Sequence, residues 1–333
     1  MRIADRASWR KSVPLQAIPK IDWARQRPTH LDAKPAVIQA ALSRSQRRPS
    51  GNWYVVAAGS DIRSDRPFGA EVGGTELVAW RDAAQKLHVG PGACPHLGAD
   101  LATGTLDCGT LICPWHGLRL SGDRSYGWKP FPCHDDGVLV WVRLDTLGGE
   151  APLDLPVVPA RPENTELHAV TQLTGTCEPR DIIANRLDPW HGAWFHPYSF
   201  TRLDVLSSPT LGDDVAEQDD RFLVAVTFRL GRFGVPVIAE FTCPGPRTIV
   251  MRIVDGEGVG SVVETHATPL RPDANGARTV VTEAVIAHSD RDGFAHARRV
   301  SRAIAPFMRY AATRLWRDDL VYAERLYSLR SQR

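Results

Sequence analysis

Two short segments carry cysteine and histidine side chains of the kind that bind transition metals. The first holds Cys94 and His96, and the second holds Cys113 and His116 after sixteen intervening residues. Two thiolates and two imidazoles suit tetrahedral zinc or an iron–sulfur cluster. Zinc sites of this composition usually pair Cys with Cys and His with His along the chain, whereas here each segment supplies one of each. The mixed pattern favours a two-iron cluster, with both cysteines on one iron and both histidines on the other.

A second set of candidate ligands follows about seventy residues later. It has the pattern N-x-x-D-x-x-H-x-x-x-x-H and contains Asp188, His191 and His196. Residues five apart do not share one face of a regular helix, so the two histidines meet only if the helix ends or bulges near Gly192. Two histidines among tryptophans are also common as ordinary core or surface residues. This segment alone therefore leaves a metal site and a packing role both open.

The elements around the first set of ligands read as a small all-β domain. From Asn52 onward, short runs rich in β-branched and aromatic residues alternate with Gly, Asp and Pro, as in WYVVAA, ELVAW and VLVWVRL. A Pro-rich stretch at residues 148–164 is typical of a linker. Before this domain, residues 1–50 are rich in Pro and Arg, with one short helix predicted over residues 34–47. We expect a basic extension at 1–50 and the β-domain at 51–150.

The rest of the chain, residues 160–333, predicts one further domain. A helical segment at 181–196 should end at Pro197. Five apolar runs between residues 221 and 288 predict an antiparallel sheet. An amphipathic pattern from 292 to 330 predicts a long C-terminal helix bent at Pro306. Together these elements predict an α+β protein.

Composition excludes several classes of function. The net charge of +2 gives no reason to expect nucleic-acid binding. No run of 18 apolar residues predicts a membrane span, and the first residues lack the apolar stretch of a signal peptide. We therefore expect a cytoplasmic protein. In a reducing compartment its clustered cysteines favour metal binding over disulfides.

The first set of ligands carries a resemblance to a known family. CPHLGA and CPWHGL resemble the two cluster-binding loops of Rieske proteins, which implies a Rieske [2Fe–2S] cluster on Cys94, His96, Cys113 and His116. Gly98 and Gly117 are expected to let backbone N–H groups approach the sulfides. Respiratory Rieske proteins carry an additional cysteine in each loop, whereas Ala99 stands here. The resemblance therefore points to the oxygenase or ferredoxin branch.

Both sets of ligands together resemble Rieske non-heme iron oxygenases. This resemblance implies a mononuclear Fe(II) held by His191, His196 and a carboxylate of the C-terminal helix, with positions open for O₂. Asp319 matches best because it precedes Glu324 by five residues, and Asp318 is the alternative.

The same resemblance implies a fold, partners and an electron path. Residues 160–333 would form a helix-grip (START-like) catalytic domain of a terminal oxygenase α-subunit, in the monooxygenase and demethylase branch. Asp188 would bridge an iron-bound histidine to a cluster histidine of the neighbouring subunit, which implies a homotrimer. No nucleotide-binding motif is present, so NAD(P)H would act only through a separate reductase, with or without a ferredoxin. The alternative is a Rieske electron carrier or ligand-binding protein without oxygenase activity.

The expected substrate is a hydrophobic small molecule, either aromatic, steroid-like or isoprenoid. Four large apolar residues of the second domain either line its pocket or form ordinary sheet core: Phe228, Phe233, Phe241 and Met251. The sequence identifies no charged anchor for such a molecule.

Overall fold

The structure is a computed structural model that describes residues 15–18 and 26–332. Part of the basic extension predicted at residues 1–50 lies outside the described residues. Within the described part, helix α1 (Pro35–Gln46) confirms the short helix predicted there, with proline in its first turn. The helix is anchored by Arg44, which is buried and pairs with Asp220 at 2.7 Å.

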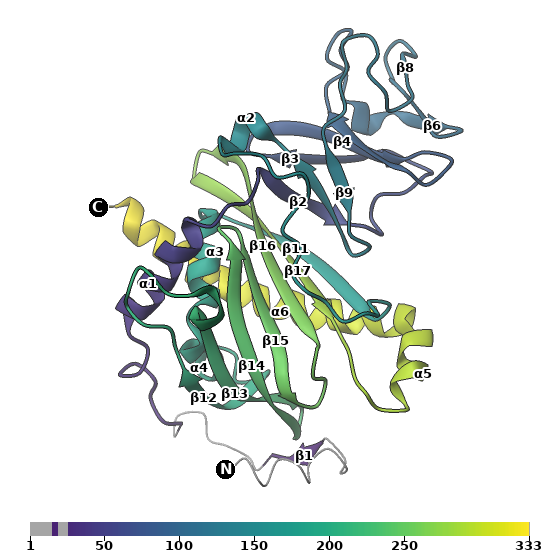
Figure 1. Ribbon diagram of the computed structural model, residues 1–333. Coiled ribbons are helices and arrows are strands. Elements are labelled where there is room, and N and C mark those ends of the chain that lie inside the picture. The colour runs from purple at the N-terminus through teal and green to yellow at the C-terminus, as the bar shows by residue number, and fades with distance from the viewer. Residues whose placement is uncertain (1–14, 19–25, 333) are drawn as a thin grey trace.

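The β-rich unit consists of three small antiparallel sheets, ordered β2-β10-β9, β3-β4-β5 and β6-β7-β8. It forms the upper part of Figure 1. Four of these strands were not expected from the sequence because they are short or half-exposed: β3, β6, β8 and β9. The strands are β2 (Trp53–Ala58), β3 (Phe68–Val72), β4 (Thr75–Arg81), β5 (Leu87–Pro91), β6 (Thr105–Asp107), β7 (Thr110–Ile112), β8 (Arg119–Leu120), β9 (Cys133–Asp135) and β10 (Leu139–Arg143), with short helices η4 (Leu101–Thr103) and α2 (Asp145–Gly148).

The second unit is built on one large antiparallel sheet with the order β11-β17-β16-β15-β14-β13-β12. The predicted runs form its five central strands, and a short strand β1 (Gln16–Ala17) adds to β14. β11 and β12, which flank the sheet, were missed because their solvent-facing residues break the apolar pattern. The strands are β11 (His168–Gly175), β12 (Phe200–Ser207), β13 (Arg221–Leu230), β14 (Phe233–Gly245), β15 (Thr248–Gly256), β16 (Val262–Asp273) and β17 (Gly276–Ile286), with a short helix η6 (Glu217–Asp219) before β13.

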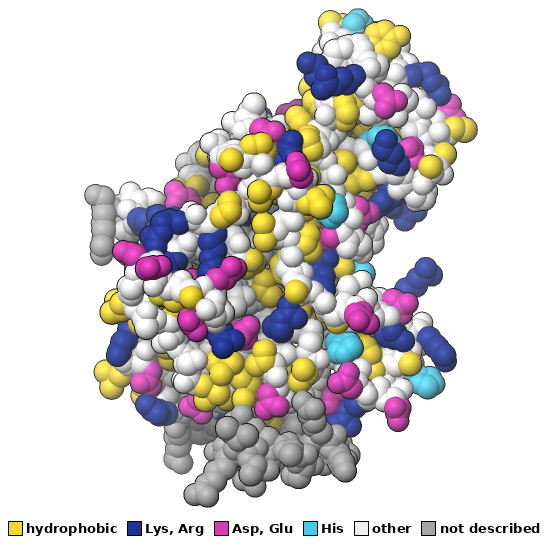
Figure 2. Space-filling model, in the orientation of Figure 1, with side chains coloured by type: hydrophobic (Ala, Val, Ile, Leu, Met, Phe, Trp, Pro, Cys, Tyr) yellow, Lys and Arg dark blue, Asp and Glu magenta, His cyan; other side chains and the backbone are white. Residues whose placement is uncertain are grey.

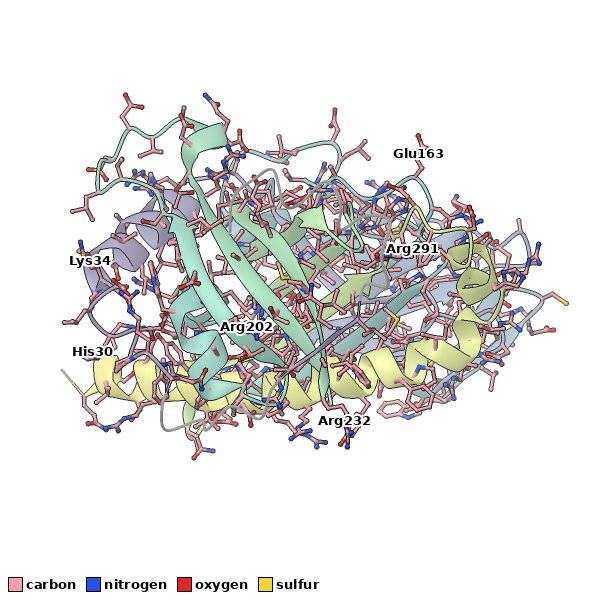
Figure 3. All side chains as sticks on the ribbon, turned by 90° about the horizontal axis from the view of Figure 1, so that it is seen from below. His30, Lys34, Glu163, Arg202, Arg232 and Arg291 are labelled. Atoms are coloured by element: carbon pink, nitrogen blue, oxygen red, sulfur yellow. The ribbon has the colours of Figure 1, made fainter. Side chains whose placement is uncertain are left out.

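The long helix α6 (Ser301–Ser331) crosses one face of this sheet and packs on β11 and on helix α3 (Pro179–Arg186). Figure 3 shows α6 spanning the strands, with Arg291 near one end and Lys34 near the other. Trp316, which is fully buried, fixes α6 to the sheet through a core that includes Ile182 and Val281. The arrangement confirms the α+β class and the predicted C-terminal helix packed on an antiparallel sheet.

Two helix predictions were wrong in detail. The segment at 181–196 is not one helix: α3 ends at Arg186, a 3₁₀ turn η5 spans Pro189–His191, and α4 spans Gly192–Phe195. The break falls before Pro189 because proline disfavours helical backbone in the residue that precedes it. At the C-terminus the chain breaks at Val300, between α5 (Phe294–Arg299) and α6. Pro306 lies inside α6 near its start, where few backbone hydrogen bonds are lost.

The segment that joins the two units is held by buried ion pairs. Residues 149–167 form no helix or strand, as the Pro-rich pattern predicts. Arg161 in this segment pairs with Asp136 of the upper unit at 2.7 Å and with Glu264 of β16 at 2.6 Å. All three side chains are at most 7% exposed. Arg161 therefore links both units through charge-assisted hydrogen bonds.

Candidate metal centres and cavity

The two cysteine–histidine loops lie side by side at the tip of the upper unit. Cys94 and Cys113 are buried, while His96 and His116 are exposed with ring centroids 4.8 Å apart. Thus the structure brings all four predicted ligands together, with sulfur inside and imidazole outside. The chemistry of this donor set fits a [2Fe–2S] cluster whose histidine-bound iron faces the surface.

Both loops contain the same backbone turn, although His96 follows Cys94 by two residues and His116 follows Cys113 by three. The N–H of Gly98 donates to Cys94 O at 2.8 Å, and the N–H of Gly117 donates to Cys113 O at 3.1 Å. Both glycines have positive φ, +78° and +70°. These two N–H groups close the turns, and the expectation that backbone N–H groups approach the cluster sulfides stays a prediction. Glycine is required here for its backbone conformation.

The rim of these loops is hydrophobic. Leu97 is 63% exposed and Trp115 is 60% exposed. Figure 2 shows histidine and hydrophobic side chains together at the top of the upper unit. Large apolar side chains at such exposure are typical of a surface that another protein covers.

The second set of candidate ligands converges where α4 meets α6. His191, His196 and Asp319 offer ligand atoms that all lie within 4.8 Å of one another. The Nε2 atoms of both histidines face Asp319 Oδ1, at 3.2 Å from His191 and 2.9 Å from His196. The local backbone makes this possible, because the 3₁₀ turn η5 ends at His191 and α4 ends at Phe195, so the two histidines do not lie on one regular helix. Two imidazoles and one carboxylate on one side of a pocket are the donor set of non-heme iron.

Each histidine ring is also contacted at Nδ1, which is on the outer edge of the ring, away from Asp319. His191 Nδ1 donates to the Asp188 carbonyl oxygen at 2.5 Å, which directs Nε2 toward Asp319 as the ring nitrogen that could bind metal. The Tyr198 hydroxyl oxygen lies 3.4 Å from His196 Nδ1. The acid Asp318 faces this outer edge as well, with Oδ2 at 3.6 Å from Nδ1. Asp318 and Asp319 thus lie on opposite edges of the same ring.

Asp319 is held as an anion. Burial opposes its ionisation, but hydrogen bonds and charge from His191 and His196 outweigh burial and hold the pKa of Asp319 well below its usual range. Asn185 Nδ2 also donates to Asp319 Oδ1 at 3.1 Å. An ionised, oriented carboxylate is what a divalent metal requires.

Sequence reasoning did not assign a role to Tyr322, the residue that contacts Asp188. The Tyr322 hydroxyl donates to Asp188 Oδ2 at 3.2 Å. Asp188 Oδ1 is buried and accepts no hydrogen bond from any residue that the structure describes. The spacing of Tyr322, three residues after Asp319 on one helix, is the signal that would have found it.

A cavity of about 270 Å³ opens onto this site between the sheet and α6. Three of the four apolar residues that the sequence assigned either to a pocket or to ordinary sheet core line this cavity: Phe228, Phe241 and Met251. Phe233 does not line it and is 42% exposed. Apart from the residues at the ligand end, Arg186 and Glu283 are the only charged residues among the described residues that line it. A small apolar molecule fits such a space.

Comparison with family models gives two matches. Residues 52–137 match the model described as Rieske [2Fe-2S] domain, and residues 147–333 match the one described as domain of unknown function (DUF5914). Among the described residues, no helix has the length and apolar character needed to cross a membrane.

Among curated proteins, an oxygenase component of 3-ketosteroid-9-alpha-monooxygenase from Rhodococcus rhodochrous is 39% identical over 79 residues, 24% of this chain and 21% of that protein. The oxygenase subunit of vanillate O-demethylase from a Pseudomonas species is 32% identical over 94 residues, 26% of this chain and 25% of that protein. The chain matches 21–41% of the length of the ketosteroid monooxygenase components to which it is similar.

Among solved structures, dicamba monooxygenase bound to dicamba superposes with a TM-score of 0.56. The match covers 86% of this chain and 90% of that chain at 17% identity. At this identity the likeness concerns the fold, and it confirms a β-rich Rieske unit followed by a sheet with a C-terminal helix.

Proposed function

The chain is a member of the Rieske oxygenase family whose C-terminal part belongs to the family described as domain of unknown function DUF5914, and from this premise we propose that it is the terminal component of an oxygenase system. It takes electrons from a separate reductase or ferredoxin and uses O₂ to hydroxylate or demethylate a hydrophobic molecule. The observation that carries the proposal is the position of His191, His196 and Asp319 at the end of an apolar cavity. We propose the basic extension at 1–50, the Rieske unit at 51–150 and the catalytic unit at 160–333.

We assign the ligands as follows. Cys94, His96, Cys113 and His116 hold the cluster, and His191, His196 and Asp319 hold the mononuclear iron. When bound, the cluster supplies single electrons and the iron supplies the site at which O₂ is reduced. Asp319 is preferred to Asp318 because it faces Nε2 of both histidines, whereas Asp318 faces only the outer edge of His196.

The remaining residues position these ligands and exclude water. Asn185 orients Asp319, and the Asp188 carbonyl selects the tautomer of His191. The apolar cavity keeps solvent from the substrate and from the reactive end of the site. Asp188 Oδ1, buried and without a described hydrogen-bond partner, is left for a group from a second subunit.

We propose a homotrimer in which the cluster of one chain docks beside Asp188 of the next. The cluster loops precede η4 and β8 at the top of Figure 1, while α4 lies at the opposite end of the molecule. The exposed Leu97 and Trp115 would be covered in such a contact. The reductase and the cytoplasmic location remain predictions from the sequence.

Oxygen uptake tests the function directly. The chemically reduced protein should consume O₂ in the presence of an accepted hydrophobic compound, with reoxidation of the cluster followed by its visible absorption. His196→Ala should keep the cluster spectrum but lose substrate-dependent uptake, and His134→Ala, a histidine outside both sites, should behave as the natural protein does. Equal uptake by His196→Ala, or none from the natural protein across aromatic, steroid and isoprenoid compounds, would favour the electron-carrier alternative.

A further inference from the structure

Arg186 and Glu283 form a charged pair in the wall of an otherwise apolar cavity. Arg186 is the last residue of α3, and Glu283 projects from β17. Both line the cavity, as do the ligands His191 and Asp319. Charged groups in such a wall are costly unless they are hydrogen-bonded.

The guanidinium of Arg186 lacks such hydrogen bonds. It donates none to any residue that the structure describes, and its Nε is buried without a partner. Its nearest carboxylate oxygen, Glu283 Oε2, lies 3.7 Å away. Two other buried arginines do form hydrogen-bonded ion pairs. Arg161 Nε lies 2.6 Å from Glu264 Oε1, and Arg44 Nη2 lies 2.7 Å from Asp220 Oδ1. The Arg186 guanidinium also lies over the Trp316 ring, 5.7 Å from its centroid, but this contact uses none of its hydrogen-bond donors, which distinguishes Arg186 from Arg161 and Arg44.

Glu283 has one carboxylate oxygen that accepts no hydrogen bond from the described residues. Its Oε2 accepts hydrogen bonds from Trp316 Nε1 and from Thr265 Oγ1, while its Oε1 accepts none from the described residues. Burial raises the pKa of Glu283, and the charge of Arg186 offsets this only in part. The wall thus offers free donors on Arg186 and a free acceptor oxygen on Glu283.

One common group satisfies both sides at once. A hydroxyl group accepts from the guanidinium and donates to the carboxylate, since it carries one donor and two lone pairs. A carbonyl or ether oxygen satisfies only Arg186, and a substrate carboxylate would meet the charge of Glu283. We propose that Arg186 and Glu283 bind a hydroxyl group of the otherwise apolar substrate. The identification of this ligand as the substrate rests on the proposed function, whereas its binding does not.

Binding of four matched probes tests the proposal without catalysis. The probes are naphthalene, 2-naphthol, 2-methoxynaphthalene and 2-naphthoate, measured by equilibrium dialysis on the iron-loaded protein without reductant. 2-Naphthol should bind at least about tenfold more tightly than naphthalene and 2-methoxynaphthalene, because only its hydroxyl pairs with both side chains. Equal affinity for the three neutral probes would mean that water alone occupies the pair, and tightest binding of 2-naphthoate would mean a carboxylate site. Either result overturns the proposal.

A double variant locates the preference in the pair. Arg186→Met with Glu283→Gln removes both charges and keeps an acceptor for Trp316, so the preference for 2-naphthol should fall at least about threefold while naphthalene binding persists. Arg180→Met changes an arginine on the same helix that does not line the cavity, and it should keep the preference. If circular dichroism finds the double variant unfolded, the probe series on the natural protein decides. A preference for 2-naphthol without substrate-dependent O₂ uptake would sink the proposed function and leave this site standing.

Discussion

Tyr322 donates its hydroxyl to Asp188 Oδ2 at 3.2 Å, and its ring lies 5.4 Å from the ring of His191. One tyrosine on α6 thus supports both the proposed bridging acid and a proposed iron ligand. The other carboxylate oxygen of Asp188, Oδ1, is left buried without a described partner. The orientation of Asp188 is therefore set from the α6 side, with its free oxygen available to a second chain.

Tyr322→Phe tests this relationship. Loss of the hydroxyl frees Asp188 to rotate, so reoxidation of the reduced cluster in stopped-flow should slow by roughly tenfold, since small misplacements are costly at reaction centres. Iron content and the cluster spectrum should not change. The matched control is Tyr310→Phe, an exposed tyrosine on the same helix. Unchanged reoxidation in Tyr322→Phe would limit Tyr322 to packing.

Asp188→Asn tests the bridge itself. The amide keeps the size of the side chain but removes its charge, so the cluster spectrum should stay intact while substrate-dependent O₂ uptake is nearly abolished. Asp213→Asn, at an exposed loop position, provides the control. Full uptake by Asp188→Asn would rule out an electron path through this acid.

Asp318→Asn and Asp319→Asn separate the two candidate third ligands. Because Asp319 faces both Nε2 atoms, Asp319→Asn should weaken iron binding by at least about tenfold, measured by titration of Fe(II) into the apo-site under anaerobic conditions. Asp318→Asn should change iron binding far less, since the contacts of Asp318 with described residues are to Tyr198 and to Nδ1 of His196, the ring nitrogen that faces away from Asp319. A reversed order of the two effects would transfer the ligand role to Asp318.

Acid should weaken the link that Arg161 makes between the two units. Burial raises the pKa of Asp136 and of Glu264, but hydrogen bonds and charge from Arg161 outweigh it and hold both below their usual range, with further hydrogen bonds from Trp141 to Asp136 and from His266 to Glu264. In the unfolded chain these carboxyls bind protons at higher pH than in the folded chain. Their stabilisation is therefore present above about pH 5 and is lost as the pH falls further.

Arg161→Met provides the corresponding variant. It removes the arginine charge from two buried carboxylates, which keep only Trp141 and backbone donors on Asp136 and His266 on Glu264 among the described residues, so the free energy of unfolding at pH 7 should fall by about 3 to 5 kcal/mol. Denaturant unfolding across pH 4–7 should then show a flatter loss of stability than in the natural protein. Arg63→Met, which removes an exposed ion pair with Asp65, should leave both quantities unchanged. A pH dependence in Arg161→Met equal to that of the natural protein would contradict this role.

The spacing of residues along the chain was sufficient to predict that His191, His196 and Asp319 lie together, but not which backbone conformation brings the two histidines to the same side. His191 and His196 were expected to meet where a helix ends or bulges near Gly192, and the boundary between the 3₁₀ turn η5 and α4 lies there, but the further break before Pro189 was not expected. Pairs such as Arg186 and Glu283 are almost one hundred residues apart and join two elements, so no local pattern marks them. Glu283 left one trace, an acid within the apolar run VVTEAVI. The link through Arg161 left none, because its partners lie in both units.

Iron and acid-labile sulfide per chain, measured in the purified natural protein and in Asp319→Asn, test the central claim most directly. The proposed pair of metal centres predicts about three iron atoms and two sulfides in the natural protein, and about two of each in the variant. Two iron atoms and two sulfides in the natural protein, after anaerobic reconstitution with Fe(II), would contradict the mononuclear site and with it the oxygenase function.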